Sequence, residues 1–246
     1  MADSGARYYQ DDLALVHHRG FGFHADMCAP GIVALLAPVR ERSGLVVELG
    51  CGSGLLTRHL LDAGHRVVAT DASPAMLDLA RHVAPDAETT CQLVLPDDPI
   101  PSADAIVSVG HALNYLPDED AVSRALVAIA QALRPGGVLA IDLCALEWGE
   151  ARRDLATHGR VGEDWSIITE PSVPAANHFV RDMTIFVKND DGSWRRDRER
   201  HDNILIDTTL VPGVLARHGV EARIRPSFGS EELPIGLRAV IGSRPA

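Results

Sequence analysis

A glycine-rich turn between two predicted elements is the strongest chemical signal in the sequence. The segment VVELGCGSG (46–54) carries Glu48 and then Gly50, Gly52 and Gly54 before an amphipathic stretch begins. Glycine lets a backbone turn sharply and approach a ligand without a Cβ in the way, and a helix that starts there presents free N–H groups. This pattern predicts a nucleotide-type ligand site at the carboxyl end of a buried strand.

The spacing of the glycines argues against a dinucleotide as that ligand. The dinucleotide fingerprint G-x-G-x-x-G needs a third glycine at position 55 or 57, where the sequence has Leu55 and Thr57. Glu48, just ahead of the loop, suits an ammonium or a sulfonium better than a pyrophosphate. Asp71, at the end of the next predicted strand, can accept from both ribose hydroxyls, although its distance from the loop fits either ligand class.

Strand-like and helix-like segments alternate from residue 44 to residue 144. The predicted strands are 44–50, 65–71, 88–94, 103–110 and 138–144, and the predicted helices are 53–64, 73–83 and 118–137. Ser53 and Ser73 are expected to cap their helices, and Pro74 suits a first helical turn. The alternation indicates βαβ units with right-handed crossovers, hence a parallel sheet with helices on both faces.

The segments that flank this region have a different pattern. Residues 8–40 are expected to form two helices, broken at Gly20 and Gly22, with Pro30 at the start of the second. Later strand-like runs cover 161–169, 178–188 and 194–206, and the NDDG at 189–192 predicts a hairpin turn between the last two. A helix at 209–219 and strands at 220–226 and 237–243 are expected to close the sheet.

Four segments in this order resemble the class I S-adenosylmethionine-dependent methyltransferases: VVELGCGSG, VVATDASPAML, the ADAIVS strand and RPGGVLAID. The resemblance implies an α/β fold, a three-layer Rossmann-like sheet of seven mostly parallel strands with the last strand antiparallel. To this the sequence adds an N-terminal helical lid and an inserted antiparallel β-ribbon. We expect a single domain over 1–246, divided into the lid (1–43), the cofactor-binding core (44–144), a substrate-side insertion (145–206) and the end of the core sheet (207–246).

The resemblance implies S-adenosylmethionine as the cofactor. Glu48 and the glycines would line its methionine part, Asp71 would hold the ribose, and Ala72 and Met76 would lie by the adenine. Where the family usually has an acidic residue beside the adenine amine, this sequence has Gln92, whose amide oxygen can accept the same hydrogen bond. Asp97 or Asp98 would take that place if the loop is longer. The expected cofactor-binding residues are Tyr9, Arg19, Glu48, Gly50, Cys51, Gly52, Gly54, Asp71, Ala72, Met76, Gln92, Leu93 and Gly110.

The acceptor side is expected where the fourth strand ends, at GHALNYL (110–116). Methyl transfer from a sulfonium is an in-line displacement, so the protein must mainly align the acceptor and, where needed, remove a proton. His111 is the expected base, because imidazole titrates near neutral pH, and Tyr115 is the second catalytic candidate. The alternatives are a hydrogen-bonded wall histidine and a packing tyrosine. The expected substrate-binding residues are His18, Phe21, Asn114, Arg200 and His201, with Arg238 as a further candidate.

Composition limits the partners and the chemistry. Among 246 residues, 23 Lys and Arg face 34 Asp and Glu, and a net charge of −11 argues against a nucleic-acid backbone as the main partner. Lys188 is the one lysine, so proton handling falls to His, Tyr or carboxylates. Four cysteines without ligand spacing predict no metal site. With no apolar run of about 20 residues and an acidic start unlike a secretory signal, we expect a cytoplasmic protein without a membrane partner.

We therefore expect an enzyme that transfers a methyl group from S-adenosylmethionine to an O or N atom of a small acceptor of the secondary-metabolite kind. The Arg-rich, Lys-poor usage suggests a bacterial source. The strand at 194–206 is polar on both faces, so it is expected to face solvent, line a pocket or form a homodimer through the ribbon. The alternatives for function are an S-adenosylmethionine-binding relative with a non-methylating or regulatory role and, less favoured, an NAD-dependent reductase.

Overall fold

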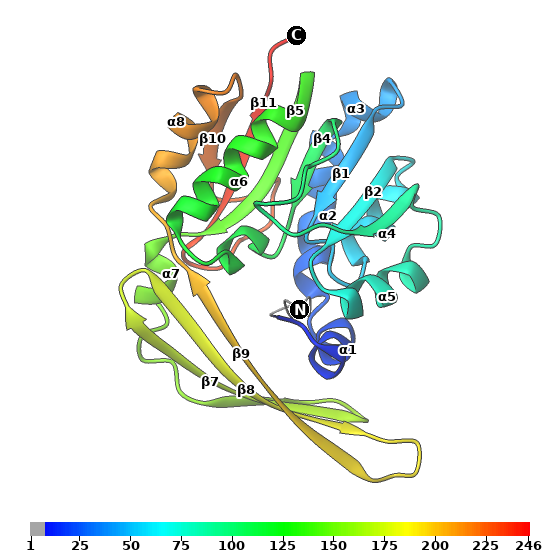
Figure 1. Ribbon diagram of the computed structural model, residues 1–246, viewed down its shortest axis with the longest axis vertical. Helices are drawn as coiled ribbons and strands as arrows, with labels where there is room; N and C mark the ends of the chain where they lie inside the picture. The colour runs from blue at the N-terminus through cyan, green and yellow to red at the C-terminus, as the bar shows by residue number, and fades with distance from the viewer. Residues whose placement is uncertain (1–7) are drawn as a thin grey trace.

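The computed structural model describes residues 8–246, so the first seven residues of the expected lid lie outside the described part. Figure 1 shows two sheets, a large one layered between helices and a long ribbon that extends away from it. No helix in residues 8–246 is long and apolar enough to cross a membrane.

The large sheet has seven strands in the order β10-β11-β5-β4-β1-β2-β3. Their bounds are β1 (Leu45–Leu49), β2 (Arg66–Asp71), β3 (Thr89–Gln92), β4 (Ala103–Ser108), β5 (Leu133–Cys144), β10 (Glu221–Arg225) and β11 (Leu237–Ser243). Strand β11 pairs antiparallel with both β5 and β10, while the pairs among β1 to β5 are parallel. The predicted fold, a mostly parallel sheet with its last strand reversed, is confirmed.

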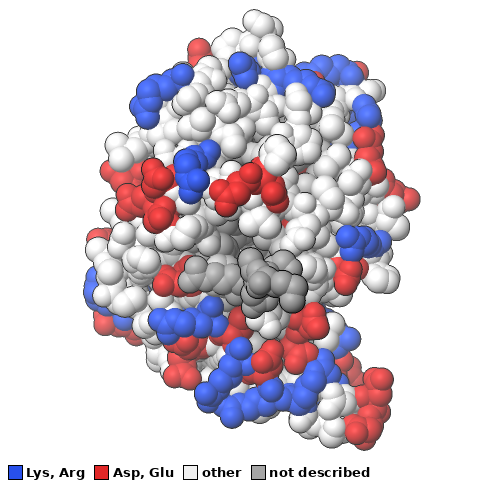
Figure 2. Space-filling view, in the orientation of Figure 1, with Lys and Arg blue, Asp and Glu red and all other residues white. Residues whose placement is uncertain are grey.

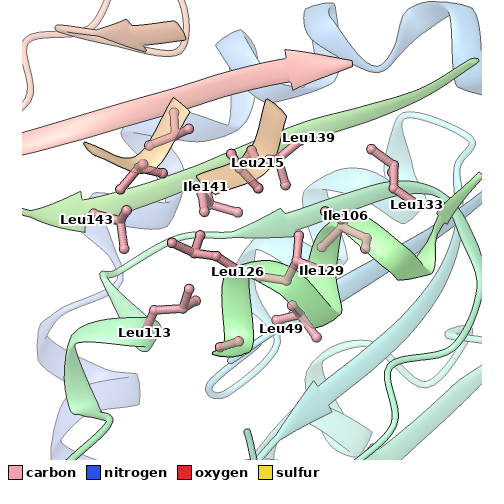
Figure 3. Packing of buried hydrophobic residues seen from close by; sticks show 14 of the residues in the cluster. Leu49, Ile106, Leu113, Leu126, Ile129, Leu133, Leu139, Ile141, Leu143 and Leu215 are labelled. Carbon is pink, nitrogen blue, oxygen red and sulfur yellow. The ribbon is translucent and has the colours of Figure 1, made fainter. Parts of the chain in front are cut away.

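Helices cover both faces of this sheet and bury its apolar strands. The helices are α1 (Asp11–Gly20), α2 (Phe23–Leu35), α3 (Ala37–Glu41), α4 (Leu55–Asp62), α5 (Pro74–Val83), α6 (Glu119–Ala132), α7 (Leu146–Glu150) and α8 (Val211–Ala216), with 3₁₀ turns η1 (Ala112–Tyr115) and η2 (Thr208–Leu210). On one face, Leu126 and Ile129 of α6 and Leu215 of α8 pack on β4 and β5 (Figure 3). On the other, α2, α3 and α4 supply Ile32, Val39 and other buried side chains.

Several predicted helix boundaries are corrected by the structure. Ser73 caps α5, since its Oγ accepts the Met76 N–H at 3.1 Å, as expected. Ser53 does not cap α4; the helix follows Gly54, and the Ser53 Oγ lies 3.0 Å from His18 Nδ1. The helix predicted over 118–137 ends at Ala132, because the residue before a proline is biased away from helical dihedrals and the chain approaches Pro135 in extended form.

The N-terminal segment forms three helices instead of two. The break at Gly20 to Gly22 is confirmed, but Pro30 lies inside α2 and does not begin it. The flanking Cys28 and Ile32 are fully buried against the sheet, so tertiary packing overrides the tendency of a proline to end a helix.

The ribbon has four strands, one more than predicted: β6 (His158–Val161), β7 (Trp165–Ala175), β8 (His178–Lys188) and β9 (Trp194–Ile204). Strand β6 escaped prediction because all four of its residues are exposed and show no alternation. The NDDG hairpin is confirmed, with the Asn189 N–H bonded to the Ser193 carbonyl at 2.8 Å. Leu13 and Val16 of α1 pack on Trp165 and Ile185, which joins the N-terminal helix to the ribbon.

The two polar faces of strand β9 differ in burial. Its inner residues Glu199, His201 and Asn203 are buried. Its outer residues Arg196, Arg198 and Arg200 are exposed. Figure 2 shows basic side chains gathered along the lower edge of the molecule, where Figure 1 places the ribbon.

Asn114 in η1 connects the sheet to the ribbon. Its amide donates to the carbonyls of Cys144 in β5, at 3.1 Å, and Ile204 in β9, at 2.5 Å. Its oxygen accepts the Cys144 N–H at 2.8 Å. The side chain is fully buried, so these hydrogen bonds replace all contact with water.

Replacing Asn114 by alanine should therefore lower the free energy of unfolding by about 3 kcal/mol, because three buried hydrogen bonds are lost at about 1 kcal/mol each. Asn189→Ala, in the exposed hairpin, is the matched control and should cost about 1 kcal/mol or less. Urea denaturation measures both values. Equal losses of unfolding free energy in the two variants would show that the buried hydrogen bonds of Asn114 stabilise the protein no more than those of an exposed hairpin residue.

Candidate active site

A cavity of about 690 Å³ lies at the carboxyl ends of β1, β2 and β4. Its floor is the glycine loop after β1, and residues of α1 and α2, including His17 and His24, line its other side. A volume of this size is typical of sites for small molecules. The predicted location of the ligand site, at the ends of parallel strands, coincides with this cavity.

The three glycines of the loop serve two different purposes. All have positive φ, 69° at Gly50, 54° at Gly52 and 83° at Gly54. A Cβ on Gly50 would lie 2.5 Å from Ala112, and one on Gly54 would lie 3.1 Å from the Ala80 backbone, so these two permit close packing. A Cβ on Gly52 would meet nothing within 4 Å. Since Gly52 lines the cavity, its missing side chain leaves space for a ligand.

Two buried carboxyl groups lie beside the loop. Asp71 accepts the Gly52 and Ser73 N–H groups, each at 2.8 Å, and burial raises its pKa although these donors act against the rise. Glu48 is 2% exposed and accepts the Thr57 hydroxyl at 2.6 Å. Burial raises the pKa of Glu48 to about 8. A buried acid that favours its neutral form is poised to ionise when a cation binds next to it.

The chemistry of this wall fits S-adenosylmethionine. The open space at Gly52 admits a ligand close to the backbone, and the carboxyl groups of Glu48 and Asp71 can oppose positive charge or accept from hydroxyls. Gln92 donates its Nε2–H to the Ala72 carbonyl at 2.9 Å and presents an amide at the cavity wall. These are the residue types that a sulfonium, an ammonium, a ribose and an adenine amine require.

Two phenols that line the cavity meet a half-buried arginine behind them. The Tyr9 and Tyr115 hydroxyls lie 2.8 Å apart, and Arg181 of β8 donates to the Tyr115 Oη at 2.6 Å and to Asn203 Oδ1 at 3.1 Å. Burial alone would lower the pKa of Arg181, but the phenol oxygens outweigh it and the pKa is raised. Burial also raises the pKa of Tyr9, so this end holds a cation and a neutral phenol at pH 7.

The residues before α1 are held against both the core and the ribbon. Glu199 of β9 accepts the backbone N–H groups of Tyr9 and Gln10, and its Oε1 lies 2.6 Å from His201 Nε2. The Tyr9 carbonyl in turn accepts from the Ser73 hydroxyl at 2.6 Å. Because one residue is tied to both sides, the phenol of Tyr9 has a defined place in the cavity.

His111 follows β4 with an unusual backbone, φ 52°, and its ring stacks on Tyr115 at 5.6 Å with an interplanar angle of 9°. Its Nδ1 is buried and has no hydrogen-bond partner among the described residues. Burial, helped by the charge of Arg181, lowers the pKa of His111 to about 3, and the same causes lower that of His17 to about 4. Both rings are therefore neutral at pH 7 and accept hydrogen bonds.

The structure brings most of the predicted cofactor residues to the cavity. Those that line it are Tyr9, Glu48, Gly50, Cys51, Gly52, Asp71, Ala72, Met76, Gln92, Leu93 and Gly110. Gly54 lies behind the loop, against α5. Arg19 does not line the cavity, because its guanidinium pairs with Asp164 in the loop before β7.

Some of the residues predicted to bind the acceptor also line the cavity, and others do not. Phe21 and Tyr115 line the cavity, and Asn114 has its amide committed to the joint described above. His201 faces inward, whereas Arg200 faces outward and pairs with Asp182 at 2.6 Å, because successive strand residues point to opposite faces. Arg238 is 3.9 Å from Glu147, outside the cavity lining.

Sequence reasoning missed Arg181, Glu199, His24 and Asp142. Two of them leave a signal that could have been used. Arg181 occupies the same strand face as Phe179, Met183 and Ile185, so a charge appears in the buried phase of the alternation. Asp142 is likewise a charge within the apolar run VLAIDLC. A charged residue at an apolar position is paired or functional more often than it is an accident.

Comparison with known proteins agrees with this geometry. Residues 46–137 match the family model described as a methyltransferase domain. A putative methyltransferase of Geobacillus sp. (strain WCH70) is 26% identical over 167 residues, which cover 66% of this chain and 68% of that protein. The trans-aconitate 2-methyltransferase of Escherichia coli (strain K12 / DH10B) is 33% identical over 127 residues. That match covers 49% of this chain and 47% of that protein, so it spans about half the length of this relative.

Solved structures are similar over nearly the whole chain. An S-adenosylmethionine-dependent methyltransferase from Clostridium acetobutylicum ATCC 824 has a TM-score of 0.77 at 15% identity, covering 95% of this chain and 98% of that one. The sugar N-methyltransferase KedS8 from Streptoalloteichus sp ATCC 53650 has a TM-score of 0.74 at 20% identity, covering 100% and 99%. CalS10, an amino pentose methyltransferase from Micromonospora echinaspora, has a TM-score of 0.71 at 20% identity, covering 96% and 98%, and was solved with S-adenosylmethionine bound. At these identities the likeness shows a shared fold.

Gly52→Ala tests whether the open space at the loop is a ligand space. The added methyl group would project into the cavity, so S-adenosylhomocysteine should bind more than about tenfold more weakly, while the positive φ should cost about 1–2 kcal/mol of stability. Gly192→Ala, in the ribbon hairpin, also combines a positive φ (85°) with open space and should show only the loss of stability. Calorimetric titration and denaturation measure the two effects. Unchanged binding of S-adenosylhomocysteine by Gly52→Ala would show that the ligand does not lie against this glycine.

Glu48→Gln tests the raised pKa of the buried acid. At pH 7 most of the Glu48 carboxyl groups are protonated in the free protein, because the pKa of about 8 lies above the solution pH. A cationic ligand favours the carboxylate, so binding of S-adenosylmethionine should release protons, and affinity should fall as the pH drops below about 8. Titrations in two buffers of different ionisation enthalpy measure the protons released.

The Glu48→Gln protein should release fewer protons than the unaltered protein, and Glu221→Gln, on the exposed edge strand β10, should release the same number. The amino group of the ligand contributes equally in all three. Identical release by Glu48→Gln would mean that Glu48 stays neutral when the ligand binds.

Proposed function

We propose that the chain, whose residues 46–137 match a methyltransferase domain, is a class I S-adenosylmethionine-dependent methyltransferase that transfers the methyl group to a nitrogen atom of a small, polar acceptor. The observation that carries this proposal is the single cavity, which joins Gly52 and Asp71 at one end to Tyr9 and Tyr115 at the other. Residues of α1 and α2 and of the loops after β1, β2 and β4 line it, and its volume of about 690 Å³ suits a small molecule better than a polymer.

The core residues would hold the cofactor. The Asp71 carboxylate would accept from the ribose hydroxyls, Glu48 would oppose the charge of the methionine part, and Gln92 would face the adenine amine. Bound S-adenosylmethionine supplies a methyl group that is already activated on its sulfonium. The protein therefore has to align the acceptor, exclude water and leave the attacking atom unprotonated.

The charges at the acceptor end favour a neutral amine. Arg181 opposes a second positive charge nearby, which favours the unprotonated and nucleophilic form of an amine. His111, with its pKa of about 3, is a weak base, and a neutral amine needs no base before it attacks. A hydroxyl acceptor would need stronger assistance. In this proposal His111 and Tyr115 orient the acceptor by hydrogen bonds, and the ammonium formed by methyl transfer loses its proton to solvent when the product leaves.

The similar structures supply the acceptor class to test first. KedS8 and CalS10 are described as a sugar N-methyltransferase and an amino pentose methyltransferase, and their folds match 100% and 96% of this chain. An amino sugar also suits the part of the cavity where the hydroxyl groups of Tyr9 and Tyr115 can form hydrogen bonds. We therefore extend the proposal to an amine on a sugar or a sugar-like molecule.

The full chain should release S-adenosylhomocysteine when it is given S-adenosylmethionine and amino sugars, and the product should gain the mass of one methylene. The matched control for each sugar is the same compound with a hydroxyl in place of the amine, which should give at least about tenfold less product. Liquid chromatography with mass spectrometry measures both species. Methylation of the hydroxyl compounds alone would contradict the nitrogen assignment.

A thermal-shift comparison addresses the other functions. S-adenosylhomocysteine should raise the melting temperature of the protein and NADH should leave it unchanged. Tight S-adenosylhomocysteine binding without transfer to any amine or hydroxyl would favour a non-methylating or regulatory role. A shift with NADH alone would favour a reductase.

A further inference from the structure

Asp142, near the end of β5, has three polar partners close to the acceptor side of the cavity. Its side chain is fully buried. Its Oδ1 accepts the His111 N–H at 2.5 Å, and its Oδ2 accepts the Gly110 N–H at 3.0 Å and lies 2.9 Å from His24 Nε2. One carboxylate thus contacts the loop after β4 and the helix α2 that lines the cavity.

The loop depends on this carboxylate for its shape. Gly110 and His111 have consecutive positive φ values of 91° and 52°, and for a histidine this conformation is strained. Successive N–H groups in such a conformation converge on one point and form a small anion site. Asp142 occupies that site, and its charge offsets the strain of the His111 backbone.

The shape of the loop determines where His111 points. The ring stacks on Tyr115 and lies 5.6 Å from Trp148 of α7. Its buried Nδ1 lacks a partner among residues 8–246. A buried polar atom without a partner is uncommon in proteins, so a water molecule or a ligand atom is expected to complete the hydrogen bonding of this nitrogen. The backbone conformation that Asp142 stabilises therefore determines the direction of the His111 side chain.

His24 adds the contribution of α2. The helix lines the cavity, and the contact of His24 with Asp142 is formed only while α2 lies on the core. If α2 moves away, the carboxylate keeps the two backbone donors and loses its third, charge-assisted partner. The position of α2 and the conformation of the loop after β4 are thus linked through one carboxylate.

We propose that Asp142 and His24 are positioning residues, which couple the docking of α2 to the orientation of His111 toward the acceptor. This proposal rests on the proposed function of the cavity, because it assigns His111 to the acceptor side. Neither residue touches the reacting atoms. Their effect is on the geometry in which the acceptor meets the methyl group, where small displacements carry large costs in rate.

The chain contains a matched control for this contact. His59 of α4 lies 2.8 Å from Asp26, so a second histidine–aspartate pair also joins α2 to the core. That pair is exposed, with side chains 43% and 62% accessible, and exposed pairs of this kind contribute little. It is also outside the loop after β4. His24→Gln and His59→Gln therefore remove the same kind of contact from the same helix at two places.

The first experiment needs no acceptor. Hydrogen exchange of the full-length free protein should be about tenfold faster at the amides of Gly110 and His111 in Asp142→Asn, because an amide side chain offers one acceptor oxygen where the carboxylate offers two. His24→Gln should speed exchange at the same amides by a smaller factor, and His59→Gln should leave them unchanged. S-adenosylhomocysteine affinity should stay within about twofold in Asp142→Asn and in His59→Gln. Unchanged exchange in both Asp142→Asn and His24→Gln would overturn the proposal, whatever the protein methylates.

The second experiment uses the acceptor found in the methylation assay. Asp142→Asn should lower kcat about tenfold or more with little change in the binding of S-adenosylhomocysteine. In a protein that already carries His111→Ala, the same change should lower kcat by less than about twofold, because Asp142 acts through His111. A full tenfold loss in both backgrounds would show a general structural role and overturn the assignment. Failure to find any acceptor would count against the proposed function, while the exchange experiment would still decide the coupling.

Discussion

Buried carboxylates that accept backbone N–H groups shape both ends of the cavity. The carboxyl ends of parallel strands leave loop N–H groups without strand partners, and these must be satisfied inside the protein. Asp71 at the end of β2 satisfies Gly52 and Ser73, and Asp142 near the end of β5 satisfies Gly110 and His111. The same solution thus occurs twice in one sheet. It holds the glycine loop after β1 at one place and the loop after β4 at the other.

The elements that could be read from the sequence depend on local patterns. The succession of strands and helices in the core, the Ser73 cap and the NDDG hairpin follow from alternation, capping chemistry and turn residues within a few positions of each other. The glycine loop and Asp71 belong to this class, since strand, turn and helix follow one another directly. Their placement at one cavity could therefore be anticipated.

The features that could not be read depend on partners far away in the chain. Glu199 binds the backbone of Tyr9 across 190 positions, and Asn114 bonds to Ile204 across 90. The residue spacing near Asn114 does not distinguish a side chain that would contact the methyl acceptor from one that joins two sheets by hydrogen bonds. Arg200 and His201 are neighbours on one strand, so the period of two predicts that their side chains face opposite ways, and the structure places Arg200 outside and His201 inside.

The insertion point of the ribbon has a consequence for the order in which the molecule is made. The ribbon lies between β5 and the strands β10 and β11 in the chain, so the ribosome must synthesise the ribbon before the strands that close the sheet. Chains are synthesised from the N-terminus at about 5–20 residues per second, and early segments begin to fold first. The cofactor loop therefore emerges many seconds before Arg181 and Glu199. Every residue of the cavity has therefore been synthesised before the closing strand β11 leaves the ribosome, and the sheet is the last part of the molecule to be completed.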